Sequence, residues 1–171
     1  MQFNTQLISL AVAIFGACAG AAYAQEVIRI GEVGLVTGPI AHLDNDLQNG
    51  ARTAIDELNA KGTVIGGKKV KFGLRSEDDG GDPTQGTAAA QKLFDEKVNA
   101  VICHLNVGTI IPASKLYFEV GTPQISPTST ISKYTQQGFN TTFRVLANVG
   151  DVESYLGPLS TYLGISFTAS S

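Results

Sequence analysis

The stretch NAVICHLNVGTIIPASKLYFEVGTPQIS, residues 99–126, decides the fold of this chain. It opens and closes with short apolar runs, each of which predicts a buried strand. Between the two runs, apolar residues recur every three or four positions, as on one face of a helix, and Pro112 falls in the first turn, where a proline is tolerated. The helical face consists of Ile110, Ala113, Leu116, Tyr117 and Val120. The order strand, helix, strand predicts a parallel α/β unit.

The residues upstream of this stretch repeat the same alternation. VIRIGEV, residues 27–33, is rich in β-branched residues and predicts a strand. Residues 47–58 carry apolar side chains at helical spacing, so they predict a helix that Asp44 or Asp46 can cap and that Lys61-Gly62 ends.

A second strand and helix fill the space before residue 99. Gly66-Gly67 turns the chain into a half-buried strand, and Asp82-Pro83, a cap residue followed by proline, begins an alanine-rich helix that runs through Phe94. Residues 143–145 and 152–163 predict a further strand and helix. The whole pattern predicts an α/β fold in which an open parallel sheet carries helices on both faces.

An open parallel sheet binds ligands beyond the carboxyl ends of its strands. The loops at 34–43, 77–82, 105–109 and 126–131 should therefore meet at one edge. A helix that begins near Gly108-Thr109 would present unpaired N–H groups to a carboxylate. The loop Ser126–Thr130 supplies hydroxyl and carbonyl groups suited to a small zwitterion, although a loop rich in serine and threonine is also an ordinary turn.

Other kinds of site find little support. Glycines around residue 34 follow a strand but do not open directly into a helix, which disfavours a dinucleotide site. The acidic residues 77–82 suit a metal but also suit a polar loop, with Asp82 as a helix cap. His104 and Cys103 stand beside an apolar run, where a hydrogen-bonded histidine and a buried thiol are the usual case. No hydrolase motif is present, so we expect no enzyme, metal or cofactor.

The net charge and the first 24 residues further narrow the classes of protein to which this chain can belong. The net charge of −3 is spread without runs, which argues against nucleic-acid partners. Residues 7–22 are almost wholly apolar and lead into Ala22-Tyr23-Ala24, so residues 1–24 are predicted to be a signal peptide. A lipoprotein signal that retains Cys18 is the alternative. The apolar run is too short to span a bilayer, and residues 25–171 suit one domain.

Several segments together resemble the leucine-binding, or branched-chain amino acid binding, periplasmic proteins of ABC transporters. They occur in the order and near the spacing typical of that family. They are GLVTGPIA at 34–41, NGARTAIDELNAKG at 49–62, EDDGGDPTQGTAAAQKL at 77–93, CHLNVGTIIPAS at 103–114 and ISPTSTI at 125–131. The resemblance implies a Rossmann-like lobe of a type I periplasmic binding fold, which closes on its ligand with a second lobe and delivers it to a membrane permease without catalysis.

By the same resemblance, the carboxylate and ammonium of an amino acid would be bound at Val107, Gly108, Thr128 and Thr130, and Leu43 would line the side-chain pocket. Val107 stands where the family has serine, and Leu43 stands where it often has an aromatic residue. The ligand is therefore left open between branched-chain amino acids and amides, urea or aromatic acids, and a sensor that signals to a receptor is a further alternative.

The family's chains are roughly twice as long as this one. We therefore expect residues 25–171 to form the amino-terminal lobe without its second lobe, as a truncated product. A fragment without function is one of the alternatives.

Overall fold

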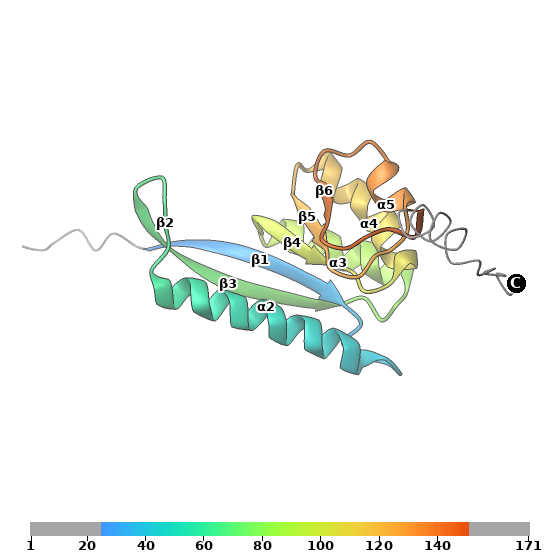
Figure 1. The fold of residues 1–171 in the computed structure, drawn as a ribbon, viewed down its shortest axis with the longest axis horizontal. Helices are drawn as coiled ribbons and strands as arrows, with labels where there is room; N and C mark the ends of the chain where they lie inside the picture. The colour runs from blue at the N-terminus through green and yellow to red at the C-terminus, as the bar shows by residue number, and fades with distance from the viewer. Residues whose placement is uncertain (1–24, 151–171) are drawn as a thin grey trace, which may run out of the picture.

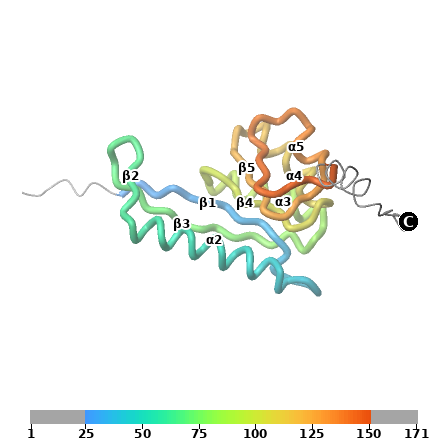
Figure 2. The backbone as a smooth tube through the Cα atoms, in the orientation of Figure 1, coloured from blue at the N-terminus to red at the C-terminus, as the bar shows by residue number. Residues whose placement is uncertain are grey.

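The computed structural model describes residues 25–150 (Figure 1). The strands are β1 (Glu26–Gly34), β2 (Val64–Ile65), β3 (Lys68–Asp78), β4 (Ala100–Cys103), β5 (Gln124–Ser126) and β6 (Thr142–Arg144). The helices are α2 (Ala41–Lys61), α3 (Pro83–Asp95), α4 (Val107–Glu119) and α5 (Lys133–Gln136). Strands and helices alternate along the backbone (Figure 2), as the sequence predicts.

The strands form one sheet in the order β2-β3-β1-β4-β5-β6. Every neighbouring pair from β3 to β6 is parallel, which confirms the predicted parallel sheet. The two-residue strand β2 is an addition that the sequence pattern does not predict, and it pairs antiparallel with β3. It arises because Gly66 and Gly67 have φ angles of 56° and 80°, the left-handed values that tight hairpin turns require.

Helices cover both faces of the sheet, as predicted (Figure 1). Two consecutive residues of β1 define the faces, because neighbouring side chains in a strand point to opposite sides. A Cβ added to Gly31 would meet Leu93 of α3, whereas Glu32 accepts a hydrogen bond from Gln48 of α2. The main hydrophobic core lies on the α3 and α4 side, where Leu93, Ile110 and other apolar residues are fully buried.

The helix ends agree with the sequence at two of three sites. Asp82 caps α3 by accepting hydrogen bonds from two backbone N–H groups, each at 2.9 Å, and Gly62 ends α2 with φ of 68°. The predicted caps of α2, Asp44 and Asp46, are wrong, because the helix already begins at Ala41. Its first amides bond to carbonyls of the preceding turn, so no side-chain cap is needed.

The carboxyl-terminal part of the sheet differs in detail from the expectation. β6 is shifted by one residue from the predicted 143–145, and α5 is a short helix that the pattern does not indicate. Ile125 and Phe143 are paired in register and are 41% and 51% exposed, so the described residues leave this apolar part of the sheet uncovered. The predicted signal at 1–24 and the predicted helix at 152–163 lie outside the described residues.

Candidate functional site

The loops after the strands meet at one edge of the sheet, and hydrogen bonds join them. The Asp78 carboxylate at the end of β3 accepts a bond of 2.6 Å from the Thr37 hydroxyl, in the loop after β1. The His104 N–H, just after β4, donates to the Val33 carbonyl of β1 at 2.8 Å. Three strand ends are therefore held together, which confirms that the loops converge.

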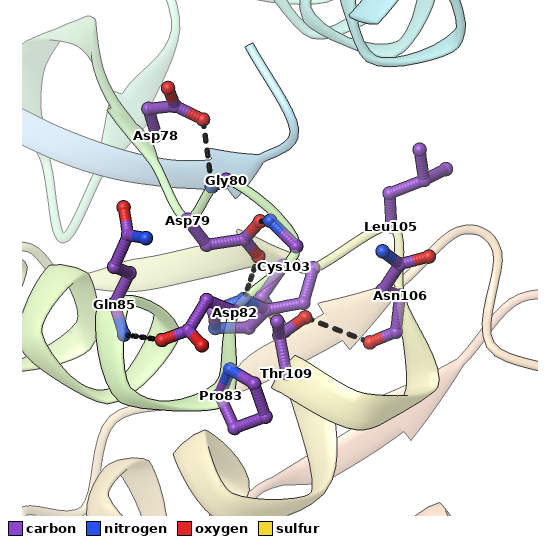
Figure 3. A network of polar contacts seen from close by, with 12 residues as sticks. Asp78, Asp79, Gly80, Asp82, Pro83, Gln85, Cys103, Leu105, Asn106 and Thr109 are labelled. Carbon is purple, nitrogen blue, oxygen red and sulfur yellow. Dashed lines mark hydrogen bonds and ion pairs between the residues drawn. The ribbon is translucent and has the colours of Figure 1, made fainter. Parts of the chain in front are cut away.

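A buried hydrogen bond made by Asp79 strengthens this junction (Figure 3). Nδ1 of His104 lies 2.7 Å from the Asp79 carboxylate, and both side chains are almost wholly buried. Burial by itself would raise the pKa of Asp79, but the bonds from His104 and from the Gly81 N–H outweigh it, so the pKa lies below its usual value. The carboxylate is therefore ionised, and His104 donates the proton of the bond.

This hydrogen bond between His104 and Asp79 tests two expectations from the sequence. His104 is a hydrogen-bonded structural residue, as expected, although its φ of 40° lies in the left-handed region that few non-glycine residues adopt. The acidic stretch 77–82 is only partly a polar loop, because Asp79 is 1% exposed. His104, which follows β4, supplies Asp79 with a donor, although β1 lies between β3 and β4 in the sheet. Sequence order does not reveal this pairing.

The N-terminus of α4 presents free backbone donors beside this junction. The N-cap Asn106 makes no side-chain capping bond, and its carbonyl accepts from the N–H groups of Thr109 and Ile110. Within residues 25–150, no hydrogen bond uses the N–H groups of Val107 or Gly108. The helix thus begins one residue before the predicted Gly108, and it offers two unpaired amides at the positive end of its dipole.

The Ser126–Thr130 loop lies against the chain that leads into α4. The Thr128 hydroxyl donates to the carbonyls of His104 and Leu105 at 3.4 and 3.3 Å. The Ser126 hydroxyl accepts from the Ser129 N–H at 2.9 Å and shapes the loop. Of the predicted site residues, Val107, Gly108 and Thr128 are therefore brought close together.

The two remaining predicted residues are placed less closely. Thr130 is exposed, and its carbonyl accepts a hydrogen bond from the Val149 N–H at 2.9 Å. Leu43 is 45% exposed on the first turn of α2, and the small cavity nearby is lined by Leu47 instead. No hydrogen bond among residues 25–150 joins Leu43 to the other four predicted residues, and its role in a site stays a prediction.

Sequence reasoning missed two buried carboxyl groups near this edge, Glu32 on β1 and Asp44 on α2. They are 2% and 1% exposed. Burial, and secondly the neighbouring Asp44, raises the pKa of Glu32 to about 7. The sequence contained a signal for Glu32. It is the only aspartate, glutamate, lysine or arginine between Arg29 and Asp44, and it interrupts an otherwise apolar strand.

Residues 25–150 show neither a cluster of metal ligands nor a membrane-spanning helix. No group of three or more histidine, cysteine or acidic residues within residues 25–150 is arranged to hold a metal ion. The same residues contain no helix both long and apolar enough to cross a membrane. Cys103 is 2% exposed, and burial raises the pKa of its thiol to about 12, so it is the inert buried residue that the sequence predicts.

This chain has an open parallel sheet with free amides and hydroxyls at the carboxyl ends of its strands. These features are typical of the class of α/β domains that bind ligands at that edge. The chain belongs to the periplasmic binding protein family, whose model matches residues 27–155. Its fold is that of the type I periplasmic binding proteins.

Relatives and solved structures agree with this assignment. The chain is 40% identical over 141 residues to Leu/Ile/Val-binding protein homolog 1 of Brucella abortus, covering 82% of this chain and 37% of that protein. An ABC transporter substrate-binding protein from Desulfitobacterium hafniense in complex with Leu has a TM-score of 0.69 and 31% identity, with 81% of this chain and 40% of that one covered.

A solute-binding protein from Rhodopseudomonas palustris in complex with 3,4-dihydroxy benzoic acid has a TM-score of 0.67 at 20% identity, covering 82% and 37% of the two chains, and it shows likeness of fold alone. The chain spans about 37% of the length of the curated relatives it matches.

Proposed function

We propose that this chain is an amino-terminal lobe that binds small amino acids of the leucine, isoleucine and valine type for an ABC transporter. The observation that carries the proposal is the pair of unpaired N–H groups at Val107 and Gly108, which suits a carboxylate. The names of the relatives and the leucine complex of a 31% identical protein support an amino acid as the ligand.

The ammonium group of the ligand would face the Thr128–Thr130 loop, where carbonyls and hydroxyls are the available acceptors. Leu43, half-exposed on α2, would contact the aliphatic side chain. A site with one wall stays open to water, so its hydrogen bonds contribute little net affinity. We therefore expect this chain to bind leucine only at millimolar concentrations.

The test is an NMR titration of the ¹⁵N-labelled chain with leucine. We expect saturable shifts at the Val107 and Gly108 amides. Leucinamide, which lacks the carboxylate, should leave these amides unmoved, and N-acetylleucine, which lacks the ammonium, should shift them with weaker affinity. The expected dissociation constant is about 1 mM, so leucine at about 50 mM should nearly saturate the site. If the Val107 and Gly108 amides did not shift at that concentration, the proposal would be contradicted.

The residues on the second loop need a matched comparison. Thr130→Ala should weaken leucine binding, whereas Thr53→Ala, on the exposed side of α2, should not. Shifts with 3,4-dihydroxybenzoate or acetamide but not with leucine would replace the amino acid by another ligand class. Such a result would keep the site and change only its specificity.

Export and the transporter complete the proposed function. Residues 1–24 would direct the chain to the periplasm, and sequencing of the exported protein should find Gln25 at its N-terminus. Labelling with palmitate that requires Cys18 would instead establish the lipoprotein alternative. The partner would be an inner-membrane permease. A protein of the full length typical of the family would bind it.

A further inference from the structure

Two buried carboxyl groups line one small cavity, which lies where β1 and the start of α2 meet the end of β4 and the chain after it. Glu32 and Asp44 are 2% and 1% exposed, and the cavity of about 10 Å³ is close to the smallest space that a water molecule fills. Oδ1 of Asp44 has no hydrogen-bond partner in the described part of the chain. A Cβ at Gly34 would lie only 1.5 Å from this oxygen, so the strand needs glycine there to admit the carboxyl group.

The surroundings provide little positive charge for two carboxylates. The backbone N–H of Leu35, in the loop after β1, acts on Asp44 and favours its ionised form. The other groups that act on the pair are Gln48 on α2, Ser76 and Asp78 on β3, Asp79 in the loop after β3, and His104 after β4. Of these, only His104 can be cationic, and it is already paired with Asp79. No lysine or arginine of residues 25–150 forms an ion pair with Glu32 or Asp44.

Two ionised carboxylates in such a place are unfavourable, because each is desolvated and each repels the other. One proton between them removes one charge and supplies a donor. A water molecule in the cavity can then accept from the protonated Glu32 and donate to the bare Oδ1 of Asp44, an arrangement that satisfies the orphaned oxygen.

We propose that Glu32 and Asp44 share a single proton through one bound water molecule and that this protonated pair fixes the first turn of α2. The turn carries Leu43, so loss of the proton would loosen the residue placed at the ligand edge. This last consequence rests on the proposed function, whereas the hydration site and the shared proton do not. Burial raises the pKa of Glu32 to about 7, which places the loss of the proton near neutral pH.

The experiment follows the carboxyl ¹³C signals of Glu32 and Asp44 in the purified chain between pH 4 and 9. We expect a transition near pH 7 that appears at both carbons, because coupled groups titrate as a pair. Asp44→Asn should lower the midpoint of Glu32, since the repelling charge is gone. Independent titration of the two carbons, each with an ordinary midpoint, would overturn the shared proton.

Two further measurements test the water and the positioning. The Gly34 or Leu35 amide should show a cross-peak to a long-lived water below pH 7, and its absence would overturn the bridge. Hydrogen-exchange protection of the first turn of α2 should fall about tenfold between pH 6 and 8. In Glu32→Gln it should stay level, and in Glu26→Gln, a change at an exposed position of the same strand, it should fall as in wild type.

A sodium ion in place of the proton is the competing occupant. If the transition moved with sodium chloride but not with choline chloride at equal ionic strength, the cavity would hold a cation, and the proposal would be wrong. None of these measurements uses an amino acid ligand. A failure to bind leucine would therefore leave this result unaffected, and the reverse also holds.

Discussion

Replacing Glu32 with glutamine should stabilise the folded chain at neutral pH and have little effect at pH 4. Glutamine has nearly the shape of glutamic acid and its carbonyl can still accept the hydrogen bond that Gln48 donates to Glu32. It carries no charge, so it avoids the burial of a carboxylate with which no lysine or arginine of residues 25–150 is paired. The gain in stability should therefore grow with pH.

The magnitude follows from the raised pKa. Burial lifts the pKa of Glu32 from 4.5 to about 7 in the folded chain. Below pH 4.5 both the folded and the unfolded chain keep the proton, so the group changes nothing. Between pH 4.5 and 7 the unfolded chain releases it while the folded chain retains it, and the wild type loses stability as the pH rises. The full loss, reached above pH 7, is about 3 kcal/mol.

Urea unfolding followed by circular dichroism at pH values from 4 to 8 provides the test. The difference in free energy of unfolding between Glu32→Gln and wild type should rise from near zero to about 3 kcal/mol across this range. Glu26→Gln, at an exposed position of the same strand, is the control and should show no such rise. A difference that is constant with pH, or that favours wild type at pH 7, would refute the reasoning.

Four other changes test the remaining features. Asp79→Asn should destabilise the chain by about 2 kcal/mol near pH 7, because His104 then loses its hydrogen bond to an ionised carboxylate. The difference from wild type should shrink as the pH falls through the lowered pKa of Asp79, and a difference independent of pH would count against that bond. Asp82→Ala should remove the cap of α3 at about 1 kcal/mol in urea unfolding, and an unchanged midpoint would contradict the cap. Leu93→Ala should lose about 3 kcal/mol in the same assay, since Leu93 is fully buried, and a loss under about 1 kcal/mol would place the core elsewhere. With Cys18 changed to serine, Cys103 should react with a thiol reagent at pH 8 only after unfolding, and fast reaction of the native chain would show an accessible thiol.

The alternation of strands and helices could be predicted because it depends on local patterns. The stretch from residue 99 to 126 contains its own strand signals and helical spacing, and the structure forms β4, α4 and β5 there. Asp82-Pro83 and Lys61-Gly62 likewise act through nearby backbone groups, so their effects can be recognised in sequence order. The predicted caps at Asp44 and Asp46 failed because turn carbonyls can satisfy a helix start without any side chain.

The candidate site was predictable only in outline. Parallel strands bring their carboxyl ends to one edge, so the meeting of the loops follows from the fold class. The contact of Thr128 with the chain before α4 becomes visible only in the tertiary structure.

The sequence by itself therefore determined the class of fold, the helix stops and the family to which the chain belongs, because these follow from spacing and from short motifs. Only the tertiary structure decided that Asp79 is paired with His104, and that Glu32 and Asp44 are buried against one cavity. The physical reason is that the state of a carboxyl group depends on what surrounds it in space. Residues 12 and 25 positions apart become neighbours only when the strands and helices pack.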